Sequence, residues 1–374
     1  MATKQTIVLV GAGHAHLHSL KHCGEWVAAG HQCVLVAPGD FWYSGLATGV
    51  LGGQYPVELD RIDVGALIER AGARFIRDRV TRIDPQTRRL FLAGGDELEY
   101  DIVSLNVGSR PPAIDGESEH AESCFAAKPV ARLCRLRGEL TTRVALGGRP
   151  PRLVVAGGGP TAFELAANAL GLAERLGKRI DVTIVAAGSR MLSRLPIPAA
   201  AALTANLEKR GLLLLAGRKV IRVAAEGVEL DDGNSVACDL FVNATGLMPS
   251  PLARDSGLPT NEEGAMLVDE HLRSTVDPGI FGGGDFVSRT DAPADKTGVH
   301  AIRQAPVLFQ NLLAASSGRQ PEAVFRPQKK YLWIMNMGDG TAMAARGRLW
   351  YRGRPALWLK DWIDRRFLRS MNSP

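Results

Sequence analysis

The sequence predicts an α/β protein with two Rossmann-like dinucleotide-binding domains and a short C-terminal appendage. Two glycine-rich loops, at residues 11–16 and 157–162, each close an apolar run and open an expected helix. Because glycine has no Cβ and a helix N-terminus favours an anion, such loops let backbone amides approach a pyrophosphate. The chain of 374 residues is also too long for one ordinary core. We therefore expect two nucleotide sites, which suits electron transfer between two cofactors.

The first half of the chain shows the periodicity of a β-α-β unit followed by further strands. We expect a strand over residues 5–10, a helix over 14–29 and a strand over 32–37. A helix over 57–71 and strands over 73–84, 88–92 and 101–106 follow. The consecutive prolines Pro111 and Pro112 then indicate a crossing into the next domain.

The same order of elements recurs after these prolines. We expect a helix over 128–146, a strand over 152–156 that enters the second loop, a helix over 161–175 and a strand over 181–186. A helix over 198–210 and strands over 212–224, 227–230 and 240–246 complete this domain. We assign the strand near 277–285 and the helix over 298–315 to the first domain.

Composition argues against several classes of protein. The net charge of +6 is modest for this length and the basic residues are dispersed, so nucleic-acid binding is not indicated. No apolar run has the length of a signal-sequence core or of a membrane span. We therefore expect a cytoplasmic protein whose contact with the cell membrane, if any, is peripheral and on the inner face.

Neither the cysteines nor the histidines form a metal pattern. The five cysteines include no CxxC pair and no zinc spacing, which is typical of thiols in a reducing compartment. His14, His18 and His22 recur every fourth residue on one expected helix, a spacing that can present imidazoles to a metal. Because His14 belongs to the first loop and no carboxylate cluster accompanies the three, we predict no metal site.

Four motifs stand in a characteristic order along residues 5–325. They are the first loop, the second loop with Glu164, the strand end at 244–246 (Ala-Thr-Gly), and Gly284 with Asp285 after an apolar strand. Together they resemble the pyridine nucleotide-disulfide oxidoreductase superfamily, which includes type II NADH dehydrogenases and sulfide:quinone oxidoreductases. The resemblance implies an FAD-binding domain at 1–112 and 247–325, an NAD(P)-binding domain at 113–246, and an appendage at 326–374.

Further motifs narrow this resemblance. The chain contains Gly-x-Gly-His-Ala-His at 11–16, Tyr-Ser-Gly at 43–45 followed by Gly-Gln-Tyr at 53–55, Lys-Pro at 128–129, and Gly-Val-x-Ala-x-Arg-Gln-x-Pro at 298–306. These are similar to motifs of a subgroup found alone or fused ahead of selenide, water dikinase. The similarity indicates membership and does not specify the substrate.

The resemblance implies an FAD site in the first domain. Backbone amides of Gly11, Gly13, His14 and Ala15 would hold the pyrophosphate, and His16 stands where glycine normally lets helix and strand pack closely. The helix over 298–312 would aim its N-terminus at the flavin pyrimidine. The remaining positions implied to line this cofactor are Ala37, Val80, Gly108, Arg110, Gly284, Asp285 (to a ribitol hydroxyl) and Gln304 (to the ring edge).

The second loop would bind the nicotinamide dinucleotide. Glu164 lies in an otherwise apolar helix, where a carboxylate is costly without a partner, so it is placed near the nicotinamide or flavin, with a structural ion pair as the alternative. Glu164 and Lys128 are the predicted catalytic residues. The residues implied at the nucleotide itself are Gly157, Gly159, Pro160, Thr161, Arg190 and Gly246.

Both domains lack the carboxylate that usually holds a ribose. Ala37 ends the second strand, and Ala186 and Ala187 end its counterpart, with Arg190 close behind. Loss of the carboxylate together with an arginine tolerates a 2′-phosphate. We predict NADPH rather than NADH, and a second domain that binds no nucleotide is the alternative.

Thiol chemistry beside the flavin is not expected. Residues 41–56 contain no cysteine, so the paired thiols of disulfide reductases are missing. Cys124 and Cys134 are followed only by Cys238, which does not match the pattern of sulfide:quinone oxidoreductases.

The segment after Pro355 predicts an amphipathic basic helix. Similar segments of type II NADH dehydrogenases lie on the membrane and form the quinone entry, and tryptophan with arginine suits an anionic lipid surface. The alternative is docking on the flavin domain or on a homodimer partner. The apolar positions are Trp358, Leu359, Trp362, Ile363, Phe367 and Met371, and the basic positions assigned to the other side are Lys360, Arg365, Arg366 and Arg369.

The function implied by the resemblance is that of an FAD flavoenzyme. NADPH or NADH would transfer hydride to the flavin, which would pass electrons to a quinone or another small acceptor. One alternative is a flavoenzyme that reduces a selenium or sulfur compound for selenophosphate supply. The other is a flavin-binding redox sensor without nucleotide turnover.

Overall fold

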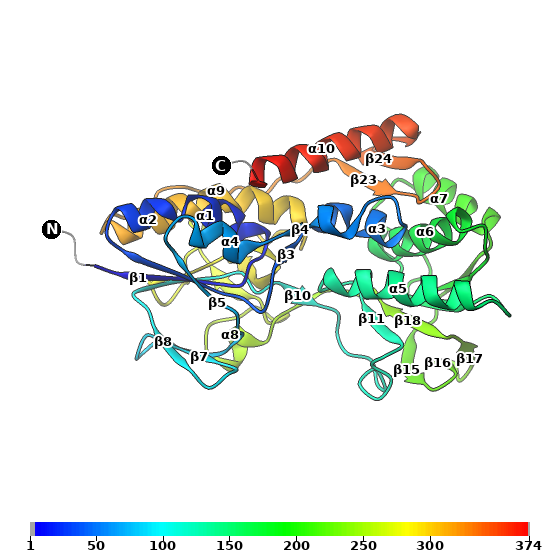
Figure 1. The fold of residues 1–374 in the computed structure, drawn as a ribbon, viewed down its shortest axis with the longest axis horizontal. Coiled ribbons are helices and arrows are strands. Elements are labelled where there is room, and N and C mark those ends of the chain that lie inside the picture. Colours follow the sequence, from blue (N-terminus) through cyan, green and yellow to red (C-terminus); the bar gives the residue numbers. More distant parts are fainter. Residues whose placement is uncertain (1–3, 373–374) are drawn as a thin grey trace. The chain divides into compact units, whose positions relative to one another are not determined.

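The computed structural model describes residues 4–372, and its contacts divide the chain into two compact units (Figure 1). Unit 1 holds the residues up to Phe41 together with Arg61–Ser109 and Met248–Lys329. Unit 2 holds Trp42–Asp60, Arg110–Leu247 and the residues from Lys330 onward. The short strands near the points where the chain changes unit are β3 (Phe41–Trp42), β4 (Arg61–Ile62), β10 (Ser109–Arg110) and β19 (Met248–Pro249).

Unit 1 is built on a parallel five-stranded sheet in the order β21-β9-β1-β2-β5. In its centre Ile7 lies opposite Cys33 on one side and Ile102 on the other. The side chains from Ile7 to Val10 are all buried, as expected for a parallel strand covered on both faces. The strands are β1 (Thr6–Val10), β2 (Gln32–Val36), β5 (Arg74–Ile76), β9 (Ile102–Leu105) and β21 (Ile280–Gly282).

Two of the helices that the sequence predicts in unit 1 are interrupted, whereas the one expected over 298–315 forms as α9. The single helix expected over 14–29 is instead a 3-10 turn and two short α-helices, and the two α-helices are separated at Cys23. The helix expected over 57–71 is also interrupted, and of that segment only α4 (Val64–Glu69) is a helix of unit 1. The helical elements are η1 (His14–His16), α1 (Leu17–His22), α2 (Gly24–Ala28), α4 (Val64–Glu69), α8 (Leu252–Asp255), η3 (Gly284–Phe286) and α9 (Gly298–Ser316).

Two smaller sheets complete unit 1. The strand expected over 73–84 is in fact two strands in different sheets, because the Asp78 side chain accepts hydrogen bonds from the backbone N–H groups of Arg79 (2.6 Å) and Gly94 (3.0 Å) and stabilises a turn. The strands are β6 (Val80–Asp84), β7 (Arg89–Leu92) and β8 (Glu97–Glu99), which are antiparallel, and β20 (Met266–Val268) and β22 (Val287–Arg289), which are parallel.

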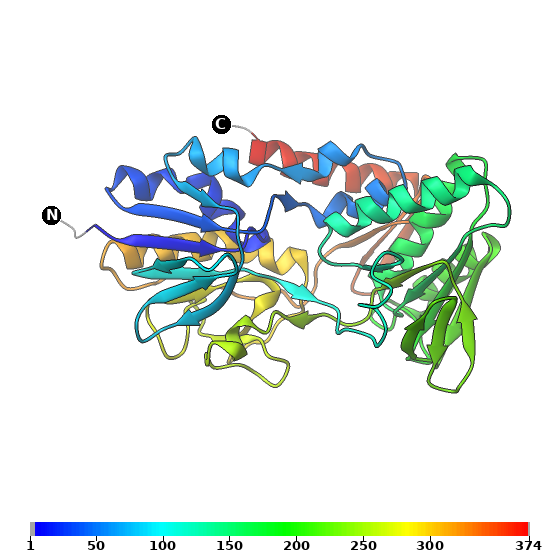
Figure 2. The same ribbon diagram turned by 60° about the horizontal axis from the view of Figure 1, so that its bottom comes forward.

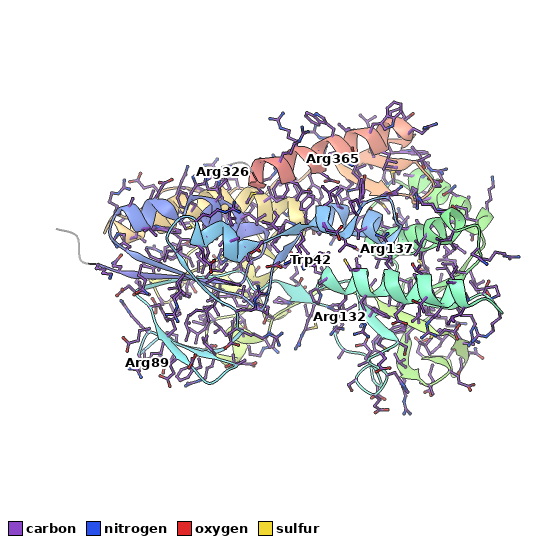
Figure 3. All side chains as sticks on the ribbon, viewed as in Figure 1. Trp42, Arg89, Arg132, Arg137, Arg326 and Arg365 are labelled. Atoms are coloured by element: carbon purple, nitrogen blue, oxygen red, sulfur yellow. The ribbon has the colours of Figure 1, made fainter. Side chains whose placement is uncertain are left out.

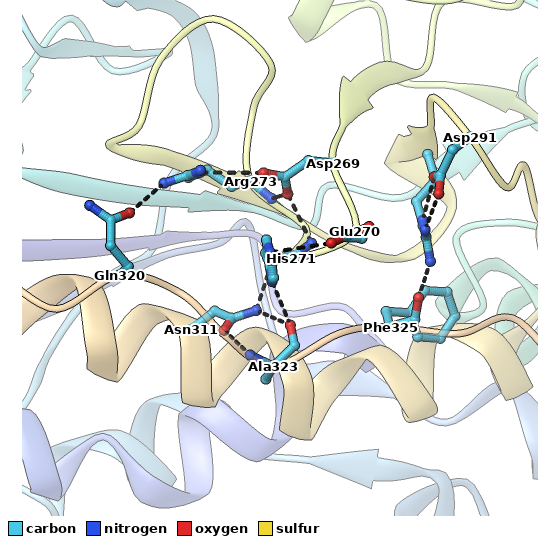
Figure 4. Close-up of polar contacts among 10 residues, drawn as sticks. Asp269, Glu270, His271, Arg273, Asp291, Asn311, Gln320, Ala323 and Phe325 are labelled. Atoms are coloured by element: carbon cyan, nitrogen blue, oxygen red, sulfur yellow. Dashed lines mark hydrogen bonds and ion pairs between the residues drawn. The ribbon is translucent and has the colours of Figure 1, made fainter.

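A buried polar network fixes the C-terminal half of α9 (Figure 4). The amide of Asn311 donates to the carbonyls of His271 and Ala323, both at 2.8 Å, and accepts from the N–H of Ala323 at 3.0 Å. Arg289 pairs with Asp291 through its Nε at 2.9 Å and also donates to the carbonyl of Phe325. The contacts of Asn311 orient the long helix that carries Gln304 nearer its N-terminus.

Unit 2 repeats the sheet pattern with the order β11-β18-β12-β13-β14, again parallel. It also contains an antiparallel three-stranded sheet formed by β15, β16 and β17, drawn in green in Figure 2. The strand expected over 212–224 is two strands, divided at Gly217, where φ is +68°. The strands are β11 (Cys124–Ala126), β12 (Arg152–Ala156), β13 (Asp181–Ala186), β14 (Leu212–Ala216), β15 (Val220–Ala224), β16 (Gly227–Leu230), β17 (Ser235–Ala237) and β18 (Leu240–Asn243).

The helices of unit 2 include one that the sequence analysis missed, α3. Its C-terminal end is held by Arg137 of α5, labelled in Figure 3, which donates to the carbonyls of Val50 and Tyr55, both at 3.2 Å. The helical elements are α3 (Ser44–Leu51), η2 (Val57–Asp60), α5 (Ala131–Leu146), α6 (Pro160–Arg175), α7 (Ile197–Lys209) and α10 (Arg354–Asn372).

The C-terminal segment packs within unit 2. It forms an antiparallel sheet, β23 (Trp333–Asn336), β24 (Ala342–Arg346) and β25 (Leu349–Gly353), followed by α10. Asn168 of α6 is completely buried and donates to the carbonyl of Asn336 at 3.0 Å. A Cβ on Gly171 would lie 2.3 Å from the carbonyl oxygen of Gly338, so this segment is pressed against α6.

Candidate functional site

The first glycine loop packs closely against the end of β9. Gly11 has φ of +86° and its N–H donates to the carbonyl of Val36 at 2.8 Å. A Cβ at Gly11 would lie 2.4 Å from the carbonyl oxygen of Asn106, and one at Gly13 would lie 2.6 Å from the Asn106 side-chain oxygen. The loop therefore requires glycine at both positions.

Asn106 is a candidate site residue that the sequence analysis missed. It is 4% exposed, and its side-chain nitrogen has no hydrogen-bond partner. Its side-chain oxygen would lie 2.5 Å from a Cβ on Gly284, so it also borders the predicted Gly284 region. A buried amide donor beside two glycine segments suits an oxygen of a bound nucleotide. The available signal was an asparagine ending an otherwise apolar strand.

His16 occupies the third loop position without disrupting the packing, because its ring is completely buried and hydrogen-bonded at both nitrogens. Nδ1 lies 2.6 Å from the Gly11 carbonyl and Nε2 lies 2.8 Å from the Ser104 hydroxyl. Since a carbonyl only accepts, Nδ1 carries the proton and Nε2 accepts from Ser104. Burial lowers the pKa of His16 to about 4, opposed by the Gly11 contact, so the imidazole is neutral at pH 7.

The predicted flavin-end residues come together in unit 1. Gln304 of α9 accepts from the N–H of Gly284 at 2.6 Å, and Ser109 donates to Asp285 at 2.7 Å. A Cβ on Gly283 would lie 2.7 Å from the Cβ of Ala15, so the first loop and the 283–285 segment are in contact. Four segments distant in sequence thus meet at one end of the sheet.

The remaining predicted FAD residues lie in varied environments. Ala37 and Val80 are buried, Gly108 has φ of +71°, and Arg110 is exposed. A carboxylate does follow β2, four residues beyond its end: Asp40, which pairs with Arg61 at 2.6 Å. The sequence analysis missed it because it looked for the acid directly at the strand end.

The second loop repeats the geometry of the first. The N–H of Gly157 donates to the carbonyl of Val185 at 2.8 Å, matching the bond from Gly11 to Val36. A Cβ at Gly157 would lie 2.3 Å from the carbonyl oxygen of Ala244. Gly159 is the N-cap of α6, Pro160 follows it at the helix start, and Thr161 is exposed. The N–H groups that open a 16-residue helix thus lie beside a glycine cradle, an arrangement that fits a pyrophosphate.

Glu164 is held by neighbours on two other segments of unit 2. Its Oε1 accepts from the Thr48 hydroxyl at 3.2 Å and from the backbone N–H of Asn336 at 2.8 Å. Burial raises the pKa of Glu164, while the positive charge of Lys360 opposes that shift. Lys128 lies two residues beyond β11 and is half-buried, with a cis peptide bond to Pro129. The catalytic roles assigned to Glu164 and Lys128 stay predictions.

The segment after β13 contains no acid. Residues 187–190 are exposed, and Arg190 donates to the carbonyl of Leu195 at 3.0 Å. Gly246 is exposed beyond β18, where Asn243 accepts from the Thr245 hydroxyl at 2.7 Å. Among residues 4–372 no group of three or more metal-binding side chains occurs, and no helix is both long and apolar enough to cross a bilayer.

The sequence of this chain is similar to those of several known proteins. A family model described as pyridine nucleotide-disulphide oxidoreductase matches residues 5–307. Terpredoxin reductase from a Pseudomonas species is 30% identical over 87% of this chain and 78% of its own length. Demethylphylloquinone reductase NdbB from Synechocystis sp. is 24% identical, over 68% of this chain and 64% of its own length. The match to the nitrite reductase large subunit of Klebsiella oxytoca spans 29% of that protein.

Solved structures match the fold as a whole. The structure of NDH2 from Plasmodium falciparum in complex with NADH aligns with a TM-score of 0.85 at 14% identity, covering 98% of this chain and 97% of that one. The sulfide:quinone oxidoreductase from Aquifex aeolicus gives 0.79 at 16% identity, over 98% and 91%. These matches confirm the predicted α/β fold with two Rossmann-like domains.

Proposed function

Since the chain belongs to the pyridine nucleotide-disulphide oxidoreductase family, we propose that it oxidises NADPH and passes the electrons through FAD to a quinone. Membership confirms the predicted superfamily, the oxidoreductase class, and FAD with a nicotinamide nucleotide as cofactors. When bound, FAD supplies a two-electron acceptor for hydride. The resemblance to the selenide, water dikinase subgroup stays a prediction.

The contacts around Asn106 support FAD in unit 1. The glycine loop leaves no room for side chains at 11 and 13, and the unpartnered Asn106 amide lies beside it. Gly11, Gly13, His14 and Ala15 would hold the pyrophosphate, with Asp285 and Gln304 toward the flavin. Asp40 is a candidate partner for the ribose hydroxyls, since its Oδ1 has no hydrogen-bond partner.

The segment after β13 supports NADPH in unit 2. No carboxylate opposes a 2′-phosphate there, and Arg190 supplies a guanidinium on the exposed side. A related solved structure is that of an engineered water-forming NADPH oxidase, made from an NADH oxidase by changes that include aspartate to alanine and alanine to arginine. The same two features, alanine without an acid and a nearby arginine, are native in this chain.

The name of one relative supports a quinone as the acceptor. A curated relative is named demethylphylloquinone reductase, and the chain spans nearly all of the Plasmodium NDH2. Other relatives are redoxin reductases, among them the 30% identical terpredoxin reductase. An iron–sulfur protein is therefore the second candidate acceptor. The balanced reaction with a quinone takes up one proton besides the hydride.

The exposed face of α10 supports peripheral membrane contact. Trp358 and Trp362 are 65% and 53% exposed, while Leu368 and Met371 of the same helix are buried. The expectation that Lys360 lies on the solvent side is wrong, because Lys360 donates to Asp364 at 2.8 Å and is largely buried. Docking of α10 on its own unit therefore leaves two tryptophans free for a lipid surface.

Vesicle binding of the full chain tests this membrane proposal. Sedimentation with phosphatidylglycerol-containing vesicles should carry down the wild type and not the double variant Trp358→Gln/Trp362→Gln. Leu146→Gln, at a residue 81% exposed on α5, is the matched control and should bind as the wild type does. Equal partitioning of all three proteins would remove the membrane proposal, and a dimer lost in the double variant would show a homodimer face instead.

Anaerobic rapid mixing tests the proposed reaction. NADPH should bleach the flavin band, and a short-chain ubiquinone should restore it. Reoxidation by a selenium or sulfur compound instead would favour the alternative enzyme, and an unbleached flavin would favour a sensor. Comparable turnover with NADH and NADPH would contradict only the proposed preference for NADPH and would leave the proposed reaction standing.

A further inference from the structure

We propose that Asp60 is a buried proton-holding group that supplies the proton taken up when the acceptor is reduced. This inference rests on the proposed quinone reduction. Asp60 ends η2 in unit 2, has no exposed surface, and neither of its carboxylate oxygens has a hydrogen-bond partner. A buried unpaired carboxylate is so costly that the group holds a proton instead.

The carboxyl group of Asp364, in contrast, has hydrogen-bond partners on both oxygens. Asp364 of α10 is 4% exposed and is fully paired: it accepts from the Tyr43 hydroxyl at 2.9 Å and from Lys360 Nζ at 2.8 Å. Lys360 also donates to the carbonyl of Gly45. Asp364 therefore has the hydrogen-bond donors that a buried carboxylate needs, whereas Asp60 has none.

Tyr43, Asp364 and Lys360 also act on Asp60. Its carbonyl accepts from the N–H of Tyr43 at 2.9 Å, so the residue whose hydroxyl holds Asp364 also fixes the Asp60 backbone. Burial first, and then the charge of Asp364, raise the pKa of Asp60 to about 8, while Lys360 opposes the shift. From α5, the thiol of Cys134 senses the charge of Asp60, which raises the pKa of that thiol.

The same charges reach the predicted catalytic glutamate. Lys360 lowers and Asp364 raises the pKa of Glu164, so the same two residues of α10 act on both Asp60 and Glu164. One buried lysine thus faces three carboxyl groups that come from η2, α6 and α10. This arrangement disfavours ionisation of all three carboxyl groups at once, and Asp60 is the one whose oxygens have no hydrogen-bond partner.

The stoichiometry of quinone reduction requires one proton besides the hydride. A hydride delivers two electrons and one proton, whereas reduction of a quinone to a quinol needs two electrons and two protons. The O–H bond of Asp60 breaks, an O–H bond forms on the quinone oxygen by way of intervening groups or water, and solvent then reprotonates Asp60. An acceptor such as ferricyanide takes single electrons and needs no proton.

Comparing the two acceptors tests the inference on the holoenzyme. With NADPH and a short-chain ubiquinone, kcat of Asp60→Asn should fall about tenfold or more, while turnover with ferricyanide stays within twofold. The wild type should lose quinone turnover as the pH rises through about 8, with no such loss for ferricyanide. The variant should show no step there, because an amide does not titrate.

A matched control separates proton supply from folding. Asp239→Asn removes a carboxylate of the same unit that is already paired with Arg149 and Arg152, and should leave the acceptor ratio unchanged. Equal losses with both acceptors, or an unchanged quinone rate in Asp60→Asn, would overturn the inference. If that variant does not fold, a wild-type quinone rate that is flat from pH 7 to 9 overturns it. A wild type that never reduces quinone would overturn the proposed function as well.

Discussion

Lowering the pH from 7 to 4 should destabilise the protein through His16. The pKa of this buried imidazole is lowered from 6.5 to about 4, whereas in the unfolded chain it returns to its ordinary value. Between these values the unfolded state binds a proton that the folded state does not. The stability contribution is therefore complete above about pH 6.5 and is lost as the pH falls toward about 4.

The size of this effect follows from the shift. A difference of about 2.5 pKa units corresponds to about 3 kcal/mol of unfolding free energy, a large part of the stability of an ordinary domain. His16→Gln removes the titrating group while keeping a polar side chain between Gly11 and Ser104. We expect this variant to lose about 1–3 kcal/mol at pH 7 because packing and hydrogen bonds are disturbed.

Urea unfolding at a series of pH values measures the difference. Other titrating groups act equally on both proteins, so the gap between wild type and His16→Gln isolates His16. The unfolding free energy of the wild type relative to that of His16→Gln should fall by about 3 kcal/mol between pH 7 and 4, mostly between pH 6.5 and 4, so that the variant is as stable as the wild type or more stable at pH 4. Parallel curves for the two proteins would show that the buried imidazole does not behave as argued.

Three further predictions concern the loops and an ion pair. Gly11→Val should abolish FAD retention on gel filtration, whereas Gly138→Ala, in open space on α5, should keep the full flavin content; bound flavin in the former would refute the close packing against β9. Arg190→Gln should raise KM for NADPH about tenfold with little change for NADH, and equal changes would remove its phosphate role. Asp239→Asn should lower the unfolding free energy by about 1 kcal/mol at pH 7 in urea unfolding. The variant should also lose less stability than the wild type below pH 4, because pairing with Arg149 lowers the pKa of Asp239. An equal loss of stability in both proteins below pH 4 would contradict this.

The sequence was most informative where local pattern determines structure. Both glycine loops and the sheets around them follow from short apolar strands ending in glycine, and the equivalent bonds of Gly11 and Gly157 confirm the internal repeat. Element boundaries were less predictable, because Asp78 and Gly217 end strands through a side-chain turn and a positive φ that hydropathy does not register.

The site residues that were missed depend on contacts between distant segments. Asn106 becomes notable only because Gly284, far along the chain, closes over it. Asp60 looks like an ordinary surface acid in sequence, and only the packing of α10 beside it, with Lys360 and Asp364 turned inward, shows that it is buried. Tertiary burial overrides what residue type alone suggests.

The most direct test of the account is hydride transfer in a variant that keeps its flavin. Gly157→Val should retain FAD in unit 1 but block the second loop, since a side chain there would collide with the Ala244 carbonyl. In anaerobic stopped-flow mixing with NADPH, the wild-type flavin band should bleach and that of the variant should not. A wild type that stays oxidised, or a variant that bleaches at the wild-type rate, would contradict the assignment of two cofactors to the two loops.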